Sequence, residues 1–295
     1  MKKIHLIIGL IASFIGLSSF VYRVTENVPE QKSLLWKIEG NGLSKPSYLF
    51  GTMHLIEKDY FYFSKSLEKT IAKSDAVVME IADINQADAL KYLTLKEGSL
   101  FDFFNKEQTD SLLIWVKANT GLDADAFRTS FGKMKPFVVL QTIMQLQFMG
   151  KTESYEKTIT EIAQAKKIKT LGLETIEQQI GIFDNLSKEQ QTEMVMAGVR
   201  GEGEGSKDDL QIMQQFYKKQ YLDSLYIYIS SKQGVINDEQ DVFLKGRNLN
   251  WIPQIKEIIK NQTAFIAVGA GHLGGEEGVI ELLKKEGYTV TPIKF

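Results

Sequence analysis

Two motifs of the form Gly-x-x-His, far apart in the chain, constrain its fold more than any other feature. Gly51-Thr-Met-His54 follows the apolar run Tyr48–Phe50, and Gly269-Ala-Gly-His272 follows the apolar run Phe265–Val268. Glycine lets a chain turn sharply off a strand and lets its backbone approach a ligand or a second loop. Ligands of open α/β sheets bind at the carboxyl ends of strands, which is where both histidines are expected. We therefore predict one sheet and one shared active centre.

Histidine is scarce in this chain. Only His5, His54 and His272 occur, and there is no cysteine. The lack of cysteine excludes disulfides, a cysteine nucleophile, zinc ribbons and Cys-anchored lipoprotein attachment. His5 lies in the N-terminal segment, so imidazole chemistry in the folded part must use His54, His272 or both. Each histidine alone also suits a hydrogen-bonded loop residue, but the shared strand-end context favours a functional role.

The composition is that of an ordinary globular protein, with 43% hydrophobic and 24% charged residues in a chain of 295. This length permits one large domain or two small ones. The formal net charge of -2 gives no field that attracts nucleic acid or anionic lipid. Nucleic-acid binding is therefore not expected.

The N-terminus has the pattern of an export signal. Lys2-Lys3 precede a run from Ile4 to Tyr22 that contains no Lys, Arg, Asp or Glu. The run has 19 residues, near the lower end of the ~17–25 that span a bilayer. Gly16-Leu17-Ser18 is a poor cleavage site, so a cleaved signal peptide and an uncleaved membrane anchor both stay open. The expected organisation is a signal peptide or anchor at residues 1–22, a linker at 23–33 and one domain at 34–295. That domain is expected outside the cytoplasm, periplasmic, extracellular or anchored to the membrane.

Hydrophobic periodicity predicts strands near both ends of this domain and helices between them. Leu35–Ile38 and Tyr48–Phe50 predict a hairpin across a turn-rich segment. Further strands are predicted at 76–79, 169–172, 264–268 and 288–293. Helices are predicted at 61–72, 109–118, 136–148, 156–165, 175–183 and 276–286, with more helix between 188 and 260. The order favours an α/β (α+β) fold. In it, the N- and C-terminal segments form a mixed, largely parallel central sheet, and long helical insertions separate them.

Three charged residues outside the motifs are further candidates for the site. Glu80 ends the apolar run Ala76–Met79, a position that suits a sheet-edge site or a solvated strand end. Glu174 follows the predicted strand 169–172, where it suits the same edge or the N-terminal dipole of the next helix. Arg247 suits a carboxylate clamp or an oxyanion stabiliser, or else a surface residue with a packed stem.

An ordered set of motifs runs through nearly the whole expected domain, from residue 34 to 293. It comprises Leu35–Ile38, Ser47–Leu55, Ala76–Ile81, Leu171–Gln178, Arg247-Asn248 with Trp251, Val268–Leu273, Gly278 and Gly287-Tyr288. This set resembles the TraB/GumN family. That family is similar to the TIKI-type metalloproteases of animals and, more distantly, to the erythromycin-esterase and ChaN-like folds.

The resemblance implies an active centre made of His54, His272, Glu80 and Arg247. TIKI-type members are peptidases that depend on a divalent metal such as manganese or cobalt. The chain is therefore expected to be a metal-dependent, peptidase-like hydrolase that binds Mn, Co or Zn through His54, His272 and Glu80. In this scheme Arg247 stabilises negative charge, and Glu174 is a fourth ligand or a general base.

One departure from the family pattern and two other interpretations stay open. Where family members often carry Gly-x-Asp before a mid-chain helix, this chain has Ser154-Tyr155-Glu156, which leaves the role of Glu156 undecided. One alternative is a metal-independent hydrolase in which a histidine acts as general base on water. The other is a non-catalytic protein that sequesters a peptide or pheromone. The expected partners are a peptide or small-molecule substrate, and the membrane if the N-terminal segment is uncleaved.

Overall fold

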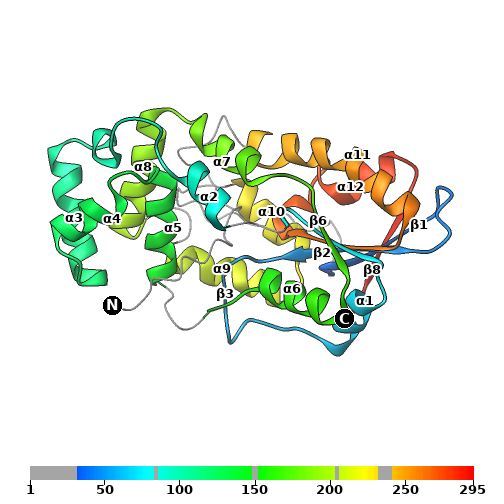
Figure 1. Cartoon of the computed structure of the whole chain (residues 1–295). Helices are drawn as coiled ribbons and strands as arrows, with labels where there is room; N and C mark the ends of the chain where they lie inside the picture. The colour runs from blue at the N-terminus through cyan, green and yellow to red at the C-terminus, as the bar shows by residue number, and fades with distance from the viewer. Residues whose placement is uncertain (1–31, 83–85, 148–151, 203–205, 232–240) are drawn as a thin grey trace.

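The computed structural model describes residues 32–82, 86–147, 152–202, 206–231 and 241–295 (Figure 1). The predicted export segment and most of the predicted linker lie outside these residues. Within the described part of the chain, no helix combines the length and the apolar character needed to cross a bilayer.

A six-stranded sheet brings the two ends of the domain together. Its order is β6-β4-β7-β2-β1-β8. The strands are β1 Leu35–Glu39, β2 Ser47–Thr52, β4 Ala76–Met79, β6 Lys169–Gly172, β7 Ala264–Gly269 and β8 Thr289–Ile293. Strands β6, β4, β7 and β2 are parallel, whereas β1 is antiparallel to both β2 and β8. The predicted mixed, largely parallel sheet built from both terminal segments is confirmed.

The local sequence explains the strands. The β1–β2 hairpin turns through Gly40, Asn41 and Gly42, which have φ angles of 82°, 45° and 81°. Such positive φ angles favour Gly and Asn, and they are typical of hairpin turns. Strands β4 and β7 are buried along their whole length. Their unbroken apolar runs are those of central parallel strands, which are covered on both faces.

The four parallel strands end at one edge of the sheet, and this positions the site. Thr52 at the end of β2 pairs with Gly269 at the end of β7. Met79 at the end of β4 pairs with Ala267 on one side and with Gly172 of β6 on the other. Because the strands point the same way, the residues that follow them emerge side by side.

Helices occupy most of the remaining described chain. They are α1 Lys65–Ala72, α2 Gln86–Leu93, α3 Lys106–Thr120, α4 Ala124–Phe131, α5 Pro136–Gln147, α6 Tyr155–Lys166, α7 Ile176–Asp184, α8 Lys188–Arg200, α9 Lys207–Lys218, α10 Leu222–Ser231, α11 Gly246–Asn261 and α12 Val279–Lys285. A π-helical turn, Asp241–Lys245, precedes α11, and a 3-10 turn, Ala270–His272, follows β7. The helix predicted at 61–72 begins later, at Lys65, because the Ser64 side chain accepts the Leu67 N–H and caps it there.

Apolar side chains form two main cores. One lies on the sheet, and the other lies among the helical insertions, where α3, α4, α5 and α8 stand apart from the sheet in Figure 1. The short segment that contains Arg247 joins the two cores. Phe243, just before α11, packs in the helical core, whereas Trp251 within α11 packs in the sheet core. Arg247 therefore lies at the boundary between them.

Candidate active site

The two motif histidines meet at the carboxylate of Glu80. Nε2 of His54 lies 3.8 Å from Oε1 of Glu80, and Nε2 of His272 lies 3.9 Å from the same oxygen. A Cβ placed on Gly269 would lie 3.3 Å from that oxygen and 3.6 Å from atoms of both imidazoles. The three residues follow β2, β4 and β7, whose parallel pairing brings them together. The structure thus brings His54, Glu80 and His272 together, as predicted, and their catalytic roles stay predictions.

Glycine allows the two motif loops to touch. A Cβ on Gly51 would lie 3.1 Å from Cα and Cβ of Ala270 and 3.1 Å from a methyl carbon of Leu273. The backbone N–H of Gly269 donates to Oε1 of Glu80 at 2.7 Å. The first contact joins β2 to the loop after β7, and the second joins β7 to β4. A side chain at Gly51 would force the loops apart.

Arg247 lies between two buried carboxylates. Its Nη2 donates to Glu80 Oε2 and Glu174 Oε1, both at 2.5 Å, and its Nε donates to Glu174 Oε2 at 3.1 Å. Its Nη1 donates to the Phe243 carbonyl at 3.3 Å and lies 2.9 Å from Nε2 of His272. A guanidinium has five N–H donors. All five are therefore engaged, and Arg247 holds three predicted site residues in fixed positions.

His272 is fixed at both ring nitrogens. Arg247 faces Nε2, and Nδ1 lies 2.7 Å from Oδ1 of Asn248. Burial, together with the positive charges of Arg247 and His54, holds the pKa of His272 well below its usual range. His272 is therefore a neutral imidazole at physiological pH.

His54 is in the opposite electrostatic state because it contacts Glu156. Its Nδ1 lies 2.7 Å from Oε1 of Glu156. Burial would lower the pKa of His54, but the carboxylates of Glu156 and Glu80 outweigh it and raise the pKa to about 9. Burial would likewise raise the pKa of Glu156, but His54 lowers it to about 2. The two side chains form an ion pair at neutral pH.

A small second sheet explains why Glu156 lies against His54. Strand β3, Ile56–Glu57, starts two residues after His54, and it pairs with β5, Thr152–Glu153, just before α6. The pairing brings the start of α6 to the end of β2. Ser154 caps this helix and donates its hydroxyl to Oε2 of Glu156 at 3.0 Å. Glu156, whose role the sequence left undecided, is thus in direct contact with a motif histidine.

Glu174 and Gln179 complete the surroundings of Glu80. The backbone N–H of Glu174 donates to the carbonyl of Glu80 at 2.9 Å. Burial raises the pKa of Glu174, although Arg247 opposes that shift. The buried Gln179 donates its Nε2–H to Glu80 Oε2 at 3.1 Å. Gln179 was not predicted from the sequence, because a glutamine inside a helix gives no local signal of a buried contact.

Nε2 of His54 is the ring nitrogen that is available for chemistry. It is buried and has no hydrogen-bond partner among the described residues. The His54 and Glu156 side chains are also the most exposed of the cluster, at 11% and 23%, whereas those of Glu80, Glu174, Arg247 and His272 are all at 7% or less. The cluster is therefore more exposed to solvent on the His54–Glu156 side than on the Arg247–His272 side.

The arrangement does not fit the expected divalent metal, although the donor types do. Among the residues that the structure describes, no group of three or more His, Cys, Asp or Glu side chains is placed to hold an ion. The physical reason is Arg247, whose guanidinium takes the Nε2 lone pair of His272 and one oxygen of Glu80. Metal binding by His54, His272 and Glu80 stays a prediction, and it requires Arg247 to release Nε2 of His272, whereas Oε1 of Glu80, the oxygen that faces both imidazoles, is not held by Arg247.

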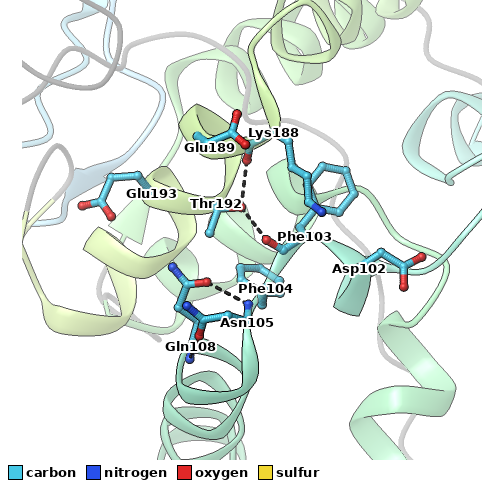
Figure 2. A pocket seen from close by; sticks show the side chains of 9 residues that line it. All are labelled: Asp102, Phe103, Phe104, Asn105, Gln108, Lys188, Glu189, Thr192 and Glu193. Atoms are coloured by element: carbon cyan, nitrogen blue, oxygen red, sulfur yellow. Dashed lines mark hydrogen bonds between the residues drawn. The ribbon is translucent and has the colours of Figure 1, made fainter.

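A polar groove of about 410 Å³ lies elsewhere, in the helical part where α3 and α8 begin (Figure 2). It contains none of the predicted site residues. Several of its polar groups already have partners: Gln108 and Asn105 cap the start of α3, and the Thr192 hydroxyl contacts the Phe103 carbonyl. The chemistry-bearing cluster is therefore the one at the sheet edge.

The model of the TraB/PrgY/gumN family matches residues 34–292, nearly the whole described chain. No curated protein and no solved structure matches this chain.

Proposed function

Since the chain belongs to the TraB/PrgY/gumN family, we propose that it is a hydrolase whose active centre is the cluster around Glu80. One observation carries the proposal: two histidine Nε2 atoms lie within 4 Å of a single buried carboxylate oxygen. Titratable groups that converge in this way, with pKa values pushed in opposite directions, are typical of catalytic sites. The proposed substrates are peptides or small molecules with a hydrolysable carbonyl.

His54 is the proposed proton-transfer residue. Hydrolysis needs a proton for the leaving group, and it needs an acceptor for the proton that the attacking water loses. With a pKa raised to about 9, His54 carries a proton at neutral pH and is suited to donate it from Nε2. Oε1 of Glu80, 3.8 Å from Nε2 of His54, is the proposed acceptor of the proton that the attacking water loses. Glu156 stabilises the charged imidazolium.

Arg247 is the proposed clamp of the site. It neutralises Glu80 and Glu174 and fixes the neutral His272 at Nε2. An oxyanion role, which the sequence also suggested, requires one of its five hydrogen bonds to break. The proposal therefore assigns Arg247 to positioning, and it assigns the first contact with substrate to His54.

A metal-dependent hydrolase is the second candidate. The observation that favours it is the support on the Nδ1 side of each histidine, Glu156 for His54 and Asn248 for His272. Metal-ligating imidazoles are usually held by an acceptor at their other nitrogen in this way. Against it stands the guanidinium of Arg247, which faces Nε2 of His272, one of the donor atoms that an ion needs.

The decisive experiment measures turnover of a mixed peptide and ester library by the purified full chain in detergent, before and after exhaustive chelation. We expect turnover to survive chelation, to be lost in His54→Gln, and to be unchanged in the exposed control Asn250→Ala. Turnover that disappears on chelation and returns with Mn, Co or Zn would establish the metal-dependent candidate. Tight binding of peptides without cleavage in every metal condition would establish sequestration and overturn the hydrolase proposal.

The proposed location is outside the cytoplasm. It rests on Lys2-Lys3 and the charge-free run that follows them. Cell fractionation tests it directly: we expect the protein in a membrane, periplasmic or extracellular fraction. Recovery of the full-length chain as a soluble cytoplasmic protein would contradict it.

A further inference from the structure

Helix α11 delivers two consecutive side chains to opposite sides of one imidazole. Arg247 places Nη1 2.9 Å from Nε2 of His272, and Asn248 places Oδ1 2.7 Å from Nδ1 of the same ring. Arg247, Asn248 and His272 are all buried. At His54 only Nδ1 is held, by Glu156, and Nε2 has no hydrogen-bond partner within the described residues.

The hydrogen-bonding roles at this ring follow from the partners. A guanidinium donates and never accepts, so Nε2 of His272 must carry the lone pair. The proton of the neutral ring is then on Nδ1, and it is donated to Oδ1 of Asn248. The orientation of the Asn248 amide is fixed independently. Its Nδ2 donates to the carbonyls of His272 and Glu277, at 3.3 and 2.8 Å, which leaves Oδ1 to face the ring.

We propose that Asn248 is a positioning residue that locks His272 in its Nδ1-protonated tautomer, so that Nε2 is a permanent acceptor for Arg247. His272 then aligns Nη1 while Glu80 and Glu174 align the rest of the guanidinium. The two histidines of the site have different roles: His54 transfers the proton, and His272 positions the clamp. The part of this inference that concerns turnover rests on the proposed function, whereas the tautomer does not.

The low pKa of His272 agrees with this assignment. Its ring is held neutral by burial and by nearby positive charge. A second proton on Nε2 would point at the Nη1 donor of Arg247, which is a repulsive contact between two N–H groups.

The test is ¹⁵N NMR of the full chain in detergent micelles, labelled only at histidine. With three histidines in the chain, the spectrum contains three imidazoles, and His5→Gln and His54→Gln assign two of them. For His272 we expect a protonated Nδ1 and an unprotonated Nε2, unchanged across neutral pH. A protonated Nε2 in the wild-type chain would overturn the proposal without the need for any variant at Asn248.

Variants at Asn248 test the lock itself. Asn248→Leu removes the acceptor, so we expect loss of the Nδ1-protonated signature and a fall in turnover on the order of 10²-fold, with KM little changed. Asn248→Asp keeps an acceptor opposite Nδ1 but loses the Nδ2 donation to the carbonyls of His272 and Glu277, so it is expected to keep the proton on Nδ1 and to retain only part of the turnover. The matched control is Asn250→Leu, the same change at an exposed position of α11, which should alter neither.

The outcomes separate this proposal from the proposed function. If no substrate is turned over, the spectra alone still decide whether Asn248 sets the tautomer. If Asn248→Leu keeps the wild-type tautomer and turnover, Asn248 is not a positioning residue, and the proposal fails even though the chain is a hydrolase. If Asn248→Leu does not fold, the wild-type spectrum and Asn248→Asp carry the test.

Discussion

The same four-residue motif occurs twice at one sheet edge, in two opposite environments. The His272 side is closed: the imidazole is neutral, its side chain is 2% exposed, and both ring nitrogens have partners. The His54 side is more open: the imidazole is charged, Glu156 beside it is 23% exposed, and Nε2 is unpartnered among the described residues. The motif determines the position of each histidine, and the neighbouring residues determine its protonation state.

The difference assigns roles that the motif alone leaves equal. Two titratable groups whose surroundings push their pKa values apart identify the acid or base and its partner in many enzymes. Here a carboxylate raises the pKa of His54, whereas burial and a guanidinium lower that of His272. The neighbours come from different elements: Glu156 from α6, and Arg247 with Asn248 from α11.

The largest expected effect comes from replacing Arg247 on the closed side, that of His272. Arg247→Met removes the cation that faces two buried carboxylates, so the charges of Glu80 and Glu174 are left uncompensated. We expect a loss of about 3–5 kcal/mol in the free energy of unfolding, measured by urea denaturation with tryptophan fluorescence. The control is Arg200→Met, since Arg200 pairs with Glu193 and Glu202 at the surface and should contribute less than about 1 kcal/mol. Equal losses in the two variants would contradict the clamp.

The next effect compares the two histidines by the pH dependence of stability. The raised pKa of His54 contributes stability that is present below pH 6.5 and lost as the pH rises through about 9. The lowered pKa of Glu156 contributes stability present above pH 4.5 and lost as the pH falls through about 2. Between pH 4.5 and 6.5, the free energy of unfolding of the wild-type chain should exceed that of His54→Gln by up to about 3 kcal/mol. This is a single contribution that His54 and Glu156 share.

His272 should give the opposite sign. Its pKa is lower in the folded chain, so the unfolded chain takes up a proton below pH 6.5 that the native chain does not. Stability relative to His272→Gln should therefore fall as the pH decreases through 6.5. Urea denaturation at a series of pH values measures both curves. Parallel curves for the two variants would show that the histidines are equivalent, against the assignment made here.

The fold and the meeting of the histidines were predictable, because both depend on local patterns. Apolar runs identified the strands, and parallel strands bring the residues that follow them to one edge. His54, Glu80 and His272 needed no more than this. The helical core was only partly predictable: periodicity predicted helices at 109–118 and 136–148, but the packing that separates them from the sheet depends on contacts between distant segments.

The electrostatic difference between the two sides was not predictable. It depends on Glu156, which reaches His54 through the pairing of two-residue strands that carry almost no signal. It also depends on Asn248 and Gln179, whose side chains turn inward from helices. The full engagement of Arg247 has the same origin, since its five acceptors come from four separate parts of the chain. That engagement, which no local pattern indicates, takes up Nε2 of His272, one of the donors of the expected metal site.

A smaller effect tests the contact between the two motif loops. Gly51→Ala places a Cβ 3.1 Å from Ala270 and Leu273. We expect a loss of about 1–3 kcal/mol in unfolding free energy, because both neighbours belong to packed backbone and core. Gly181→Ala is the control: nothing lies within 4 Å of its added Cβ, and alanine in a helix is favoured over glycine by about 1 kcal/mol. A Gly51→Ala chain as stable as the control would mean that the loops separate easily.

The smallest expected effect comes from replacing Ser154 on the open side, that of His54. Ser154 caps α6 by accepting the Lys157 N–H, and it donates its own hydroxyl to Glu156. Ser187 caps α8 in the same way, by accepting the Gln190 N–H. Each change to alanine removes a cap, so both should cost about 1 kcal/mol in unfolding free energy. Only Ser154→Ala removes a hydrogen bond from the partner of His54, so it alone should also lower turnover and shift the ¹⁵N titration of His54. If Ser187→Ala shifts that titration equally, the shift comes from the general loss of stability on removing a helix cap. The Ser154 hydroxyl would then have no role in orienting the His54–Glu156 ion pair.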